Sequence, residues 1–283
     1  MPAQTGFLQF SAKTKAQWQV PVATIGGLPI AVIDRARSAG LMVDVALARR
    51  GRTLRPLVFT SANGQVLSMC ARDQRLRELF LATDLIHADG MPMVFVSRLF
   101  HATPLPERAA TTDLFHDVAA VAQQRGANMF MLGTTKASMN QAAQRVRELY
   151  PQLGIAGFGS GYLRRDGDEE RIIAEINERR PDILWLGLGA PAEQYFALRN
   201  RDRLTGVGLI KTSGGLFDFI SGKNARAPAW MQRAGLEWAY RIYQEPRRLA
   251  GRYLLTNPHA LFLLLTRTER DEPAALPRSV SAS

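Results

Sequence analysis

Three polar side chains follow two short apolar runs, at positions where they could do chemistry. Asp89 directly follows the run 85–88, and Ser61 and Asn63 follow the run 57–60. If the two runs are parallel strands, these side chains face one cleft at the carboxyl edge of a sheet. A carboxylate there can act as a general base that deprotonates a hydroxyl group. Because Asp89 precedes a glycine, a purely structural turn is the alternative.

Glycine and small hydroxyl residues end the later apolar runs. The stretch 187–192 (Gly-Leu-Gly-Ala-Pro-Ala) fits the spacing of a dinucleotide fingerprint, in which glycines let the backbone approach a pyrophosphate at a helix N-terminus. The full fingerprint needs an acidic residue about 20 positions further on, and residues 207–212 contain none. The pattern favours a nucleotide-diphosphate or sugar pocket over a nicotinamide site, with tight structural turns as the alternative. The candidate contacts are Gly133, Thr134, Gly187, Gly189, Gly214 and Gly215.

The C-terminal part of the chain is strongly basic. Residues 223–267 hold eight Lys/Arg against two Glu, a net charge of +6. Arg241, Arg248 and Arg252 would share a face if a helix continued through Pro246. An apolar face would lie beside it, made of Trp230, Ala234, Trp238 and Ile242. Such a segment suits an anionic membrane surface, and guanidinium groups also bind diphosphates. A packed helix with solvated arginines is the alternative.

The histidines and the single cysteine show no spacing typical of a protein metal site. The histidines at 87, 101, 116 and 259 are scattered, and we expect them to be surface or core residues. The single cysteine, Cys70, cannot form an internal disulfide or by itself a thiolate metal site. We therefore expect no metal cofactor.

An alternation of strands and helices must position these residues. The expected strands are 57–60, 85–88, 129–132, 155–157, 183–188 and 207–211. The expected helices are 34–50, about 64–82, 113–125, 136–149, 168–180 and 192–203. This order gives right-handed crossovers. It predicts an α/β fold: a Rossmann-like parallel sheet with helices on both faces, plus a basic helical C-terminal appendage.

Length and composition agree with that architecture. The chain has 283 residues, of which 46% are hydrophobic, and a net charge of +11. These values exclude wholesale disorder and point to a partner rich in negative charge. The first 25 residues show no apolar stretch of a secretory signal, and the run Leu261–Leu265 is too short to cross a membrane. We expect a cytoplasmic protein that can lie on a membrane.

Composition also divides the chain into four parts. We expect a leader over 1–27, an α/β core over 28–222, an Arg-rich helical appendage over 223–270 and a disordered tail over 271–283. Pro246 and Pro258 should divide the appendage into about three helical pieces.

Several segments, in the same order, resemble the WecG/TagA/CpsF family of bacterial glycosyltransferases. They run from residue 57 to about 252: Thr60-Ser61-Ala62-Asn63, Ala88-Asp89-Gly90-Met91-Pro92, Glu107-Arg108 with Asp113-Leu114, Phe130-Met131-Leu132-Gly133, Gly187-Leu188-Gly189-Ala190-Pro191, Gly214-Gly215-Leu216-Phe217-Asp218-Phe219, Gly222 with Arg226-Ala227-Pro228, Gly235-Leu236-Glu237-Trp238-Ala239-Tyr240-Arg241 and Glu245-Pro246-Arg247-Arg248.

The resemblance implies an inverting transfer of a hexose from a UDP-sugar to an undecaprenyl-diphosphate-linked sugar, at the inner face of the cytoplasmic membrane and without a metal. It makes Asp89 the base and Ser61 and Asn63 the family's Thr-x-Asn pair, with Thr60 as a substitute hydroxyl. It adds further substrate contacts at Arg108, Pro191, Glu193 and Gln194. It assigns the diphosphate and lipid to Arg226, Arg241, Arg248 and Arg252. A homo-oligomer is left open.

Two departures from the family pattern bear on the donor sugar. The family usually has Pro-Lys-Gln-Glu where this chain has Pro191-Ala192-Glu193-Gln194, and Thr112 replaces a usual glycine. Members transfer N-acetylmannosamine, its uronic acid or glucose, and we favour glucose or another neutral hexose. The alternative functions are an NAD(P)-dependent Rossmann oxidoreductase and a basic RNA-binding protein. A nucleic-acid partner fits less well, because aromatic residues are not interleaved with the charges.

Overall fold

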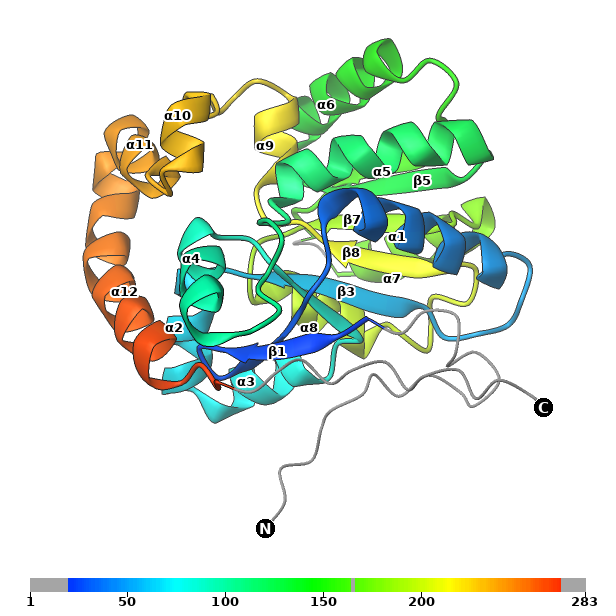
Figure 1. The fold of residues 1–283 in the computed structure, drawn as a ribbon. Helices are drawn as coiled ribbons and strands as arrows, with labels where there is room; N and C mark the ends of the chain where they lie inside the picture. Colours follow the sequence, from blue (N-terminus) through cyan, green and yellow to red (C-terminus); the bar gives the residue numbers. More distant parts are fainter. Residues whose placement is uncertain (1–19, 164–165, 271–283) are drawn as a thin grey trace, which may run out of the picture.

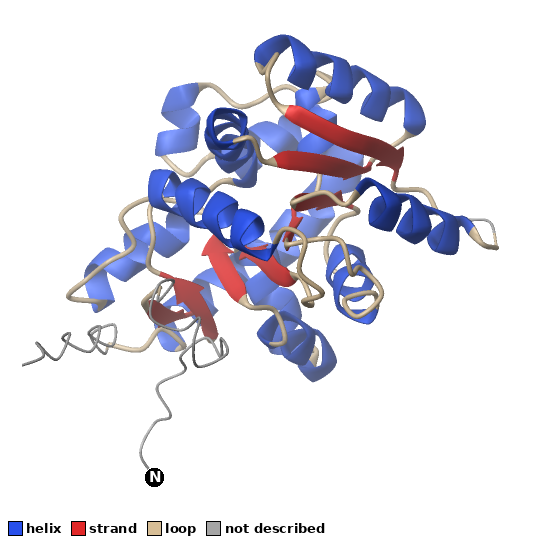
Figure 2. Cartoon of the chain, turned by 90° about the vertical axis from the view of Figure 1, so that its right-hand side faces the viewer, coloured by secondary structure: helices blue, strands red, loops and turns tan. Residues whose placement is uncertain are grey.

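A six-stranded parallel sheet forms the centre of the molecule in the computed structural model, which describes residues 20–163 and 166–270 (Figure 1). The strands, in the order in which they lie side by side, are β4 (Leu85–Ala88), β3 (Leu57–Ala62), β8 (Leu209–Thr212), β7 (Ile183–Gly187), β5 (Asn128–Gly133) and β6 (Gly154–Ser160). Every neighbouring pair is parallel. Figure 2 shows the strands between two layers of helices, so the expected α/β architecture is confirmed.

Alternating side chains of the central strands enter two separate cores. Phe59 and Trp185 pack beneath α1 (Arg35–Arg49), α5 (Thr111–Arg125), α6 (Lys136–Leu149) and α9 (Leu216–Ile220). Val58 and Leu184 face the other way, toward α7 (Asp168–Arg179) and α8 (Ala192–Arg199). Both faces of the sheet are therefore buried, as expected for parallel strands joined by helices.

The helices after β5 and β7 leave toward opposite faces of the sheet. Helix α6 follows β5 into the first core, and α8 follows β7 into the second. The two loops therefore separate at the carboxyl ends of neighbouring strands, which is where open α/β sheets bind ligands.

A small hairpin and three helices make a third core at the β4 edge. The hairpin is β1 (Val22–Ile25) and β2 (Leu28–Ala31), and it packs with α2 (Gly64–Arg72), α3 (Gln74–Leu81) and α4 (Met91–Phe100). The strand β1 corrects the expected leader over 1–27, because Ile25 is fully buried in this core. Residues 1–19 and the expected disordered tail, 271–283, lie outside the described residues.

Three helices follow α9 and curve around α4 (Figure 1): α10 (Ala229–Arg233), α11 (Glu237–Gln244) and α12 (Pro246–Thr266). The number of helices agrees with the three pieces expected, but only one of the two expected breaks, at Pro246, is found. Pro258 lies inside α12, and the other break comes at Gly235, which has a φ of +74°. Thr256 and Ala260, on either side of Pro258, are buried, so packing holds the helix across the missing N–H donor.

Two further elements differ from the sequence expectation. The single helix expected over about 64–82 is interrupted at Asp73, whose side chain accepts hydrogen bonds from the N–H groups of Arg75 and Leu76 and so begins α3. Helix α4 was not expected. It follows Asp89 directly, with Gly90 as its N-cap and Pro92 in its first turn.

Candidate active site

Asp89 stands directly after β4, at the carboxyl edge of the sheet. Its backbone N–H donates to the carbonyl of Ala62 at 2.8 Å, and the Thr111 hydroxyl lies 3.4 Å from its Oδ2. Burial raises the pKa of Asp89 to about 6, while the positive charges of Arg108 and Lys211 oppose that rise. A carboxyl group with this pKa can accept a proton near neutral pH.

Ser61, one strand away, faces the same side of the sheet as Asp89. Its hydroxyl accepts a hydrogen bond from Lys211 Nζ at 2.8 Å and lies 3.3 Å from the Thr111 hydroxyl. Ser61 is paired in register with His87, whose ring is fully buried. Burial, aided by the Lys211 charge, holds the pKa of His87 well below its usual value, so the ring is neutral. The structure thus brings Ser61 and Asp89 together, as the sequence predicted.

Thr60 belongs to the opposite face of the sheet. Its hydroxyl is fully buried, 2.8 Å from the Thr212 hydroxyl, and accepts from Gln194 Nε2 at 2.9 Å. Successive strand residues point to opposite faces, so Thr60 cannot take the place of Ser61. This corrects the expectation that it is a substitute hydroxyl.

Asn63 begins the helix that follows β3. Its side-chain oxygen accepts a hydrogen bond from the N–H of Val66 at 3.2 Å, which makes it the N-cap of α2. That bond fixes the side chain beside Gly90, where its Cα lies 4.0 Å from the position that a Cβ would take. Asn63 therefore lies next to the Asp89 turn, with its amide N–H groups as hydrogen-bond donors.

The loop after β7 binds a carboxylate of its own chain. Glu193 is buried, and its Oε2 accepts from the N–H of Gly214 at 2.8 Å and of Gly189 at 3.2 Å. Burial raises the pKa of Glu193, and these N–H groups and Lys211 oppose the rise. Two N–H groups expected to approach a nucleotide thus donate to Glu193. The peptide bond between Ala190 and Pro191 in this loop is cis. Gly215, which follows Gly214, is exposed.

Gly133 and Gly187 let β5 and β7 approach each other closely at the sheet edge. A Cβ on Gly133 would lie 2.6 Å from the carbonyl oxygen of Gly187, and one on Gly187 would lie 2.7 Å from the Phe217 ring. Thr134 follows with a φ of +40°, and its hydroxyl donates to Asp218 at 2.5 Å. Phe217 and Asp218 lie in α9, so this edge of the sheet is tied to the segment that leads into the C-terminal helices.

Arg108 and Arg226 form ion pairs that join the core to the C-terminal helices. Arg108 donates to Glu237 at 2.8 Å. Arg226 donates to the same carboxylate at 3.2 Å and to Asp113 at 2.9 Å. Gln232 accepts from both guanidinium groups, at 2.9 Å from Arg108 and 2.6 Å from Arg226. Both arginines therefore already have anionic partners, and a diphosphate would have to replace Glu237.

The remaining three arginines do not share one continuous helix face, because α11 ends before Pro246. Arg241 stacks over the Phe219 ring, with 5.4 Å between its guanidinium carbon and the ring centroid. Arg248 pairs with Glu245 at 2.5 Å. Arg252 lies 4.7 Å from the centroid of the Tyr253 ring, and its buried Nε has no hydrogen-bond partner among the described residues.

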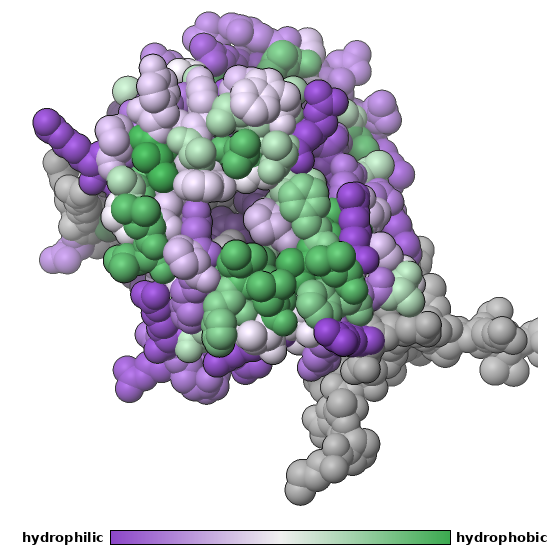
Figure 3. Space-filling model, turned by 60° about the vertical axis from the view of Figure 1, so that its left-hand side comes forward, coloured by the Kyte–Doolittle hydropathy of each residue, from purple (hydrophilic) through white to green (hydrophobic). Residues whose placement is uncertain are grey.

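Large apolar side chains are exposed on the same side of the molecule. They lie on α4 and on the segment from α10 to α12: Phe95, Leu99, Trp230, Leu236, Trp238, Tyr243, Leu254, Leu255, Leu261, Phe262 and Leu265. We call this set the apolar side. Figure 3 shows hydrophobic side chains gathered around a hollow there. None of the helices in the described ranges is long and apolar enough to cross a bilayer.

The described residues contain no group of three or more His, Cys, Asp or Glu side chains that could hold a metal ion. Asp166 and Asp168 form an Asp-x-Asp pair where α7 begins, and Asp168 pairs with Arg171. Cys70 is buried with a free thiol whose pKa burial raises to about 11.

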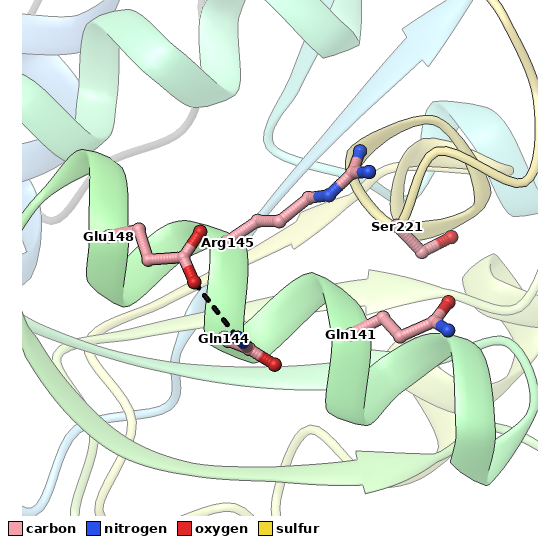
Figure 4. A pocket seen from close by; sticks show the side chains of 5 residues that line it. All are labelled: Gln141, Gln144, Arg145, Glu148 and Ser221. Atoms are coloured by element: carbon pink, nitrogen blue, oxygen red, sulfur yellow. Dashed lines mark hydrogen bonds between the residues drawn. The ribbon is translucent and has the colours of Figure 1, made fainter.

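A polar pocket lies between α6 and the end of α9 (Figure 4). Arg145 lines it and donates to the carbonyl of Ile220 at 3.1 Å, and Gln144 donates to Glu148 at 2.9 Å. These side chains bind their own chain, and we assign the pocket no part in the candidate site.

A family model described as the glycosyl transferase WecG/TagA/CpsF family matches residues 23–273. The chain belongs to this family. The protein is therefore a glycosyltransferase, which replaces the oxidoreductase and RNA-binding alternatives. The match begins inside β1 and ends beyond α12, so it covers the hairpin, the sheet and the C-terminal helices together.

Curated relatives agree with the family assignment. The chain is 31% identical over 67% of its length, and 72% of the relative's, to an N-acetylglucosaminyldiphosphoundecaprenol N-acetyl-beta-D-mannosaminyltransferase of Bacillus spizizenii. It is 29% identical over 68% of its length to the Bacillus subtilis protein of the same name, covering 73% of that protein, and 24% identical over 68% to the one of Staphylococcus aureus, covering 74%.

The WecG/TagA/CpsF motifs did not reveal every residue that faces Asp89. Thr111, Lys211 and Glu237 all lie within hydrogen-bonding or electrostatic reach of its carboxyl group. Glu237 lies within the segment Gly235–Arg241 that resembles the family, but the resemblance implies no role for it. The sequence signal that could have revealed Lys211 is its charge, because it stands between Ile210 and Thr212 in an otherwise uncharged strand.

Proposed function

We propose that this protein transfers a hexosyl group, with inversion, from a UDP-sugar to a sugar linked to undecaprenyl diphosphate. The observation that carries the proposal is Asp89, a partly buried carboxyl group with a pKa of about 6 at the ligand-binding edge of the sheet. The relatives named above act on a lipid of this kind. The product would be a building block of an exopolysaccharide, a capsule or a cell-wall polymer.

In the proposed reaction Asp89 takes the proton of an acceptor hydroxyl. The oxygen then attacks the anomeric carbon from the side opposite UDP, the bond from that carbon to the diphosphate oxygen breaks, and UDP leaves with the bonding electrons. Asn63 and Ser61 orient a sugar through their side-chain hydrogen-bonding groups. General base catalysis of this kind contributes a factor of about 10²–10⁴ to the rate.

The negative charge of the diphosphates requires cations, and we assign it to the arginines of the C-terminal helices rather than to a metal. Arg252 carries a buried Nε with no partner among the described residues, and Arg241 lies over Phe219 in α9, close in sequence to the edge loop. Guanidinium groups form short, charge-assisted hydrogen bonds to phosphate oxygens. Transfer should therefore persist in EDTA.

The loop after β7 bears on the identity of the donor sugar. Glu193 and Gln194 are both buried and bound to their own chain, so they do not offer the contacts of the usual Pro-Lys-Gln-Glu sequence. We favour glucose or another neutral hexose as the donor and keep N-acetylmannosamine, the sugar in the relatives' name, as the principal alternative.

A transfer assay tests the function. The purified protein is incubated with UDP-glucose, UDP-N-acetylmannosamine or the corresponding uronic acid donor, and with a polyprenyl-diphosphate N-acetylglucosamine acceptor in anionic detergent–lipid micelles. Transfer from at least one donor, unchanged by EDTA, is expected. No transfer from any UDP-sugar would overturn the proposal.

The role of Asp89 is tested with Asp89→Asn, which removes the base but keeps the size of the side chain. We expect kcat to fall by about 10²–10⁴-fold. The matched control is Asp202→Asn, because Asp202 is exposed and pairs with Arg55 away from the site. In the unchanged protein kcat/KM should rise with pH through about 6, since the carboxylate form exists above that pKa. Full transfer activity in a folded Asp89→Asn variant would disprove the assignment.

A further inference from the structure

Lys211 is a buried cation in the middle of the sheet. It lies in β8, in register with Phe59 of β3 and Trp185 of β7, and its side chain is fully buried. It is the only buried lysine or arginine among residues 20–163 and 166–270. A charge in such a place is costly unless hydrogen bonds and counter-charges compensate it.

The contacts of Lys211 point toward the candidate active site. Its Nζ donates to the Ser61 hydroxyl at 2.8 Å and to the carbonyl of Thr212 at 2.9 Å. Burial lowers the pKa of Lys211 to about 8, while the charges of Asp89 and Glu193 oppose that fall. The nearby His87 ring is neutral, so it adds no positive charge. Lys211 thus remains mostly cationic near neutral pH, between two carboxyl groups.

Four charged groups act on Asp89 from the elements around it. Arg108, in the loop before α5, and Lys211, in β8, favour its ionised form, whereas Glu237 in α11 opposes it. Arg226 also interacts electrostatically with Asp89. Arg108 and Arg226 are both paired with Glu237, which cancels part of their field. Arg108 is the stronger of the two favourable charges on Asp89. Lys211, which also interacts with Glu193, adds a second positive charge from within the sheet and forms no ion pair of this kind among the described residues.

We infer that Lys211 is a positioning residue of the transfer reaction: it fixes the Ser61 hydroxyl and supplies the internal positive charge that keeps Asp89 ionised. This inference rests on the proposed role of Asp89 as the base. The lysine does not touch the substrates. It acts through two residues that do, and it does so from within the sheet, where its position is set by β3 and β7.

The first test is the pH dependence of transfer in Lys211→Met, which keeps the length of the side chain and removes its charge. Without the nearby cation the pKa of Asp89 should rise by about one unit. The acidic limb of kcat/KM then moves to higher pH. The fold-decrease in kcat/KM relative to the unchanged protein is therefore about five times larger at pH 6 than at pH 8. A loss that is equal at all pH values would overturn the inference.

Two further variants separate charge from packing. Ser61→Ala removes the hydrogen-bond acceptor and keeps the lysine, so activity should fall without movement of the acidic limb. Lys211→Gln keeps a hydrogen-bond donor and removes the charge, so it should move the limb as Lys211→Met does. It also provides a readout if the methionine variant does not fold. A glutamine variant with an unmoved limb would contradict the proposed electrostatic role.

A direct titration of Asp89 makes the test independent of catalysis. The ¹³C resonance of its carboxyl carbon is identified by its loss in Asp89→Asn, and its pKa is compared between the unchanged protein and Lys211→Met. If the pKa of Asp89 is raised in Lys211→Met but the unchanged protein transfers sugar from no donor, the charge coupling is supported and the proposed function is wrong. Transfer that depends on Asp89, with an unchanged pKa in the variant, would remove the role of Lys211 alone.

Discussion

Glu193 occupies a position where the sequence pattern led us to expect substrate. The glycines on either side of it supply backbone N–H groups at the end of β7 and β8, and such groups commonly bind phosphate. Here two of them, at Gly189 and Gly214, donate to the Glu193 carboxylate instead. A carboxyl group of the chain therefore fills this part of the edge, and its ionised form repels any diphosphate that comes close.

Replacing Glu193 with glutamine should strengthen the binding of UDP. Glutamine keeps an oxygen that can accept from Gly214, and it removes a negative charge near the loop. We expect the Kd for UDP to fall about fivefold, which corresponds to about 1 kcal/mol and to one unit charge removed at about 4 Å in a water-like dielectric. Isothermal titration calorimetry measures this Kd, with Glu178→Gln on the exposed face of α7 as the control. Weaker binding would show instead that Glu193 shapes the loop for the nucleotide.

The elements of the sheet could be predicted because their sequence signals are local. Buried parallel strands are short apolar runs, and the glycines or hydroxyl residues that follow them mark the carboxyl edge. Asp89 and Ser61 could therefore be placed together before the structure was known. Helix α4 could not, because Phe95 and Leu99 are exposed while Met93 and Val94 are buried, so the apolar residues do not follow one face.

The remaining differences depend on tertiary contacts. Pro258 is a local signal for a helix break, but α12 packs on α2 so closely that a Cβ on Gly64 would lie 3.0 Å from Ala260 Cβ. The place of Lys211 depends on which strands flank β8, and the sequence of β8 does not contain that information. Likewise, only the folded chain shows that Glu237 joins Arg108 to Arg226.

Helix α12 is part of the folded core as well as of the appendage. Leu263 and Leu264 are buried with the hairpin and α2. Beyond the helix, the N–H of Gly27 donates to the carbonyl of Arg267 at 2.8 Å, and the N–H of Glu269 donates to Thr24 at 3.1 Å. Deleting the whole region after residue 222 would therefore expose the third core as well as remove the arginines.

We expect Leu263→Ala to lower the free energy of unfolding by about 2–5 kcal/mol, because it leaves a cavity in that core. The matched control is Leu261→Ala, whose side chain is exposed two positions away in the same helix and should change stability by less than about 0.5 kcal/mol. Urea unfolding followed by circular dichroism measures both. Equal stability of the two variants would mean that α12 folds independently of the hairpin.

Charge and apolar surface lie on the same part of the whole molecule. Of the net charge of +11, +6 falls within residues 223–267, a segment that includes α10 to α12. The apolar side covers the same helices and α4, and Figure 3 shows its hydrophobic residues around a hollow. Exposed apolar groups beside arginines suit the boundary between lipid headgroups and acyl chains. We propose an anionic bilayer as the partner of this surface, since a lipid-linked acceptor would present its diphosphate there.

Leu254 and Leu255 provide the sharpest test of this surface, because they are 73% and 67% exposed and adjacent on α12. Replacing both with glutamate adds two negative charges and removes two apolar contacts. We expect affinity for vesicles of equal parts phosphatidylglycerol and phosphatidylcholine to fall by about tenfold or more, since lost apolar burial and like-charge repulsion act together.

Leu149→Glu is the control, because Leu149 is 59% exposed on α6 outside the apolar side. Co-sedimentation measures binding, and high salt should weaken it in the unchanged protein. Equal binding of the double variant and the control, or equal binding to neutral vesicles, would show that this side of the molecule does not meet the membrane.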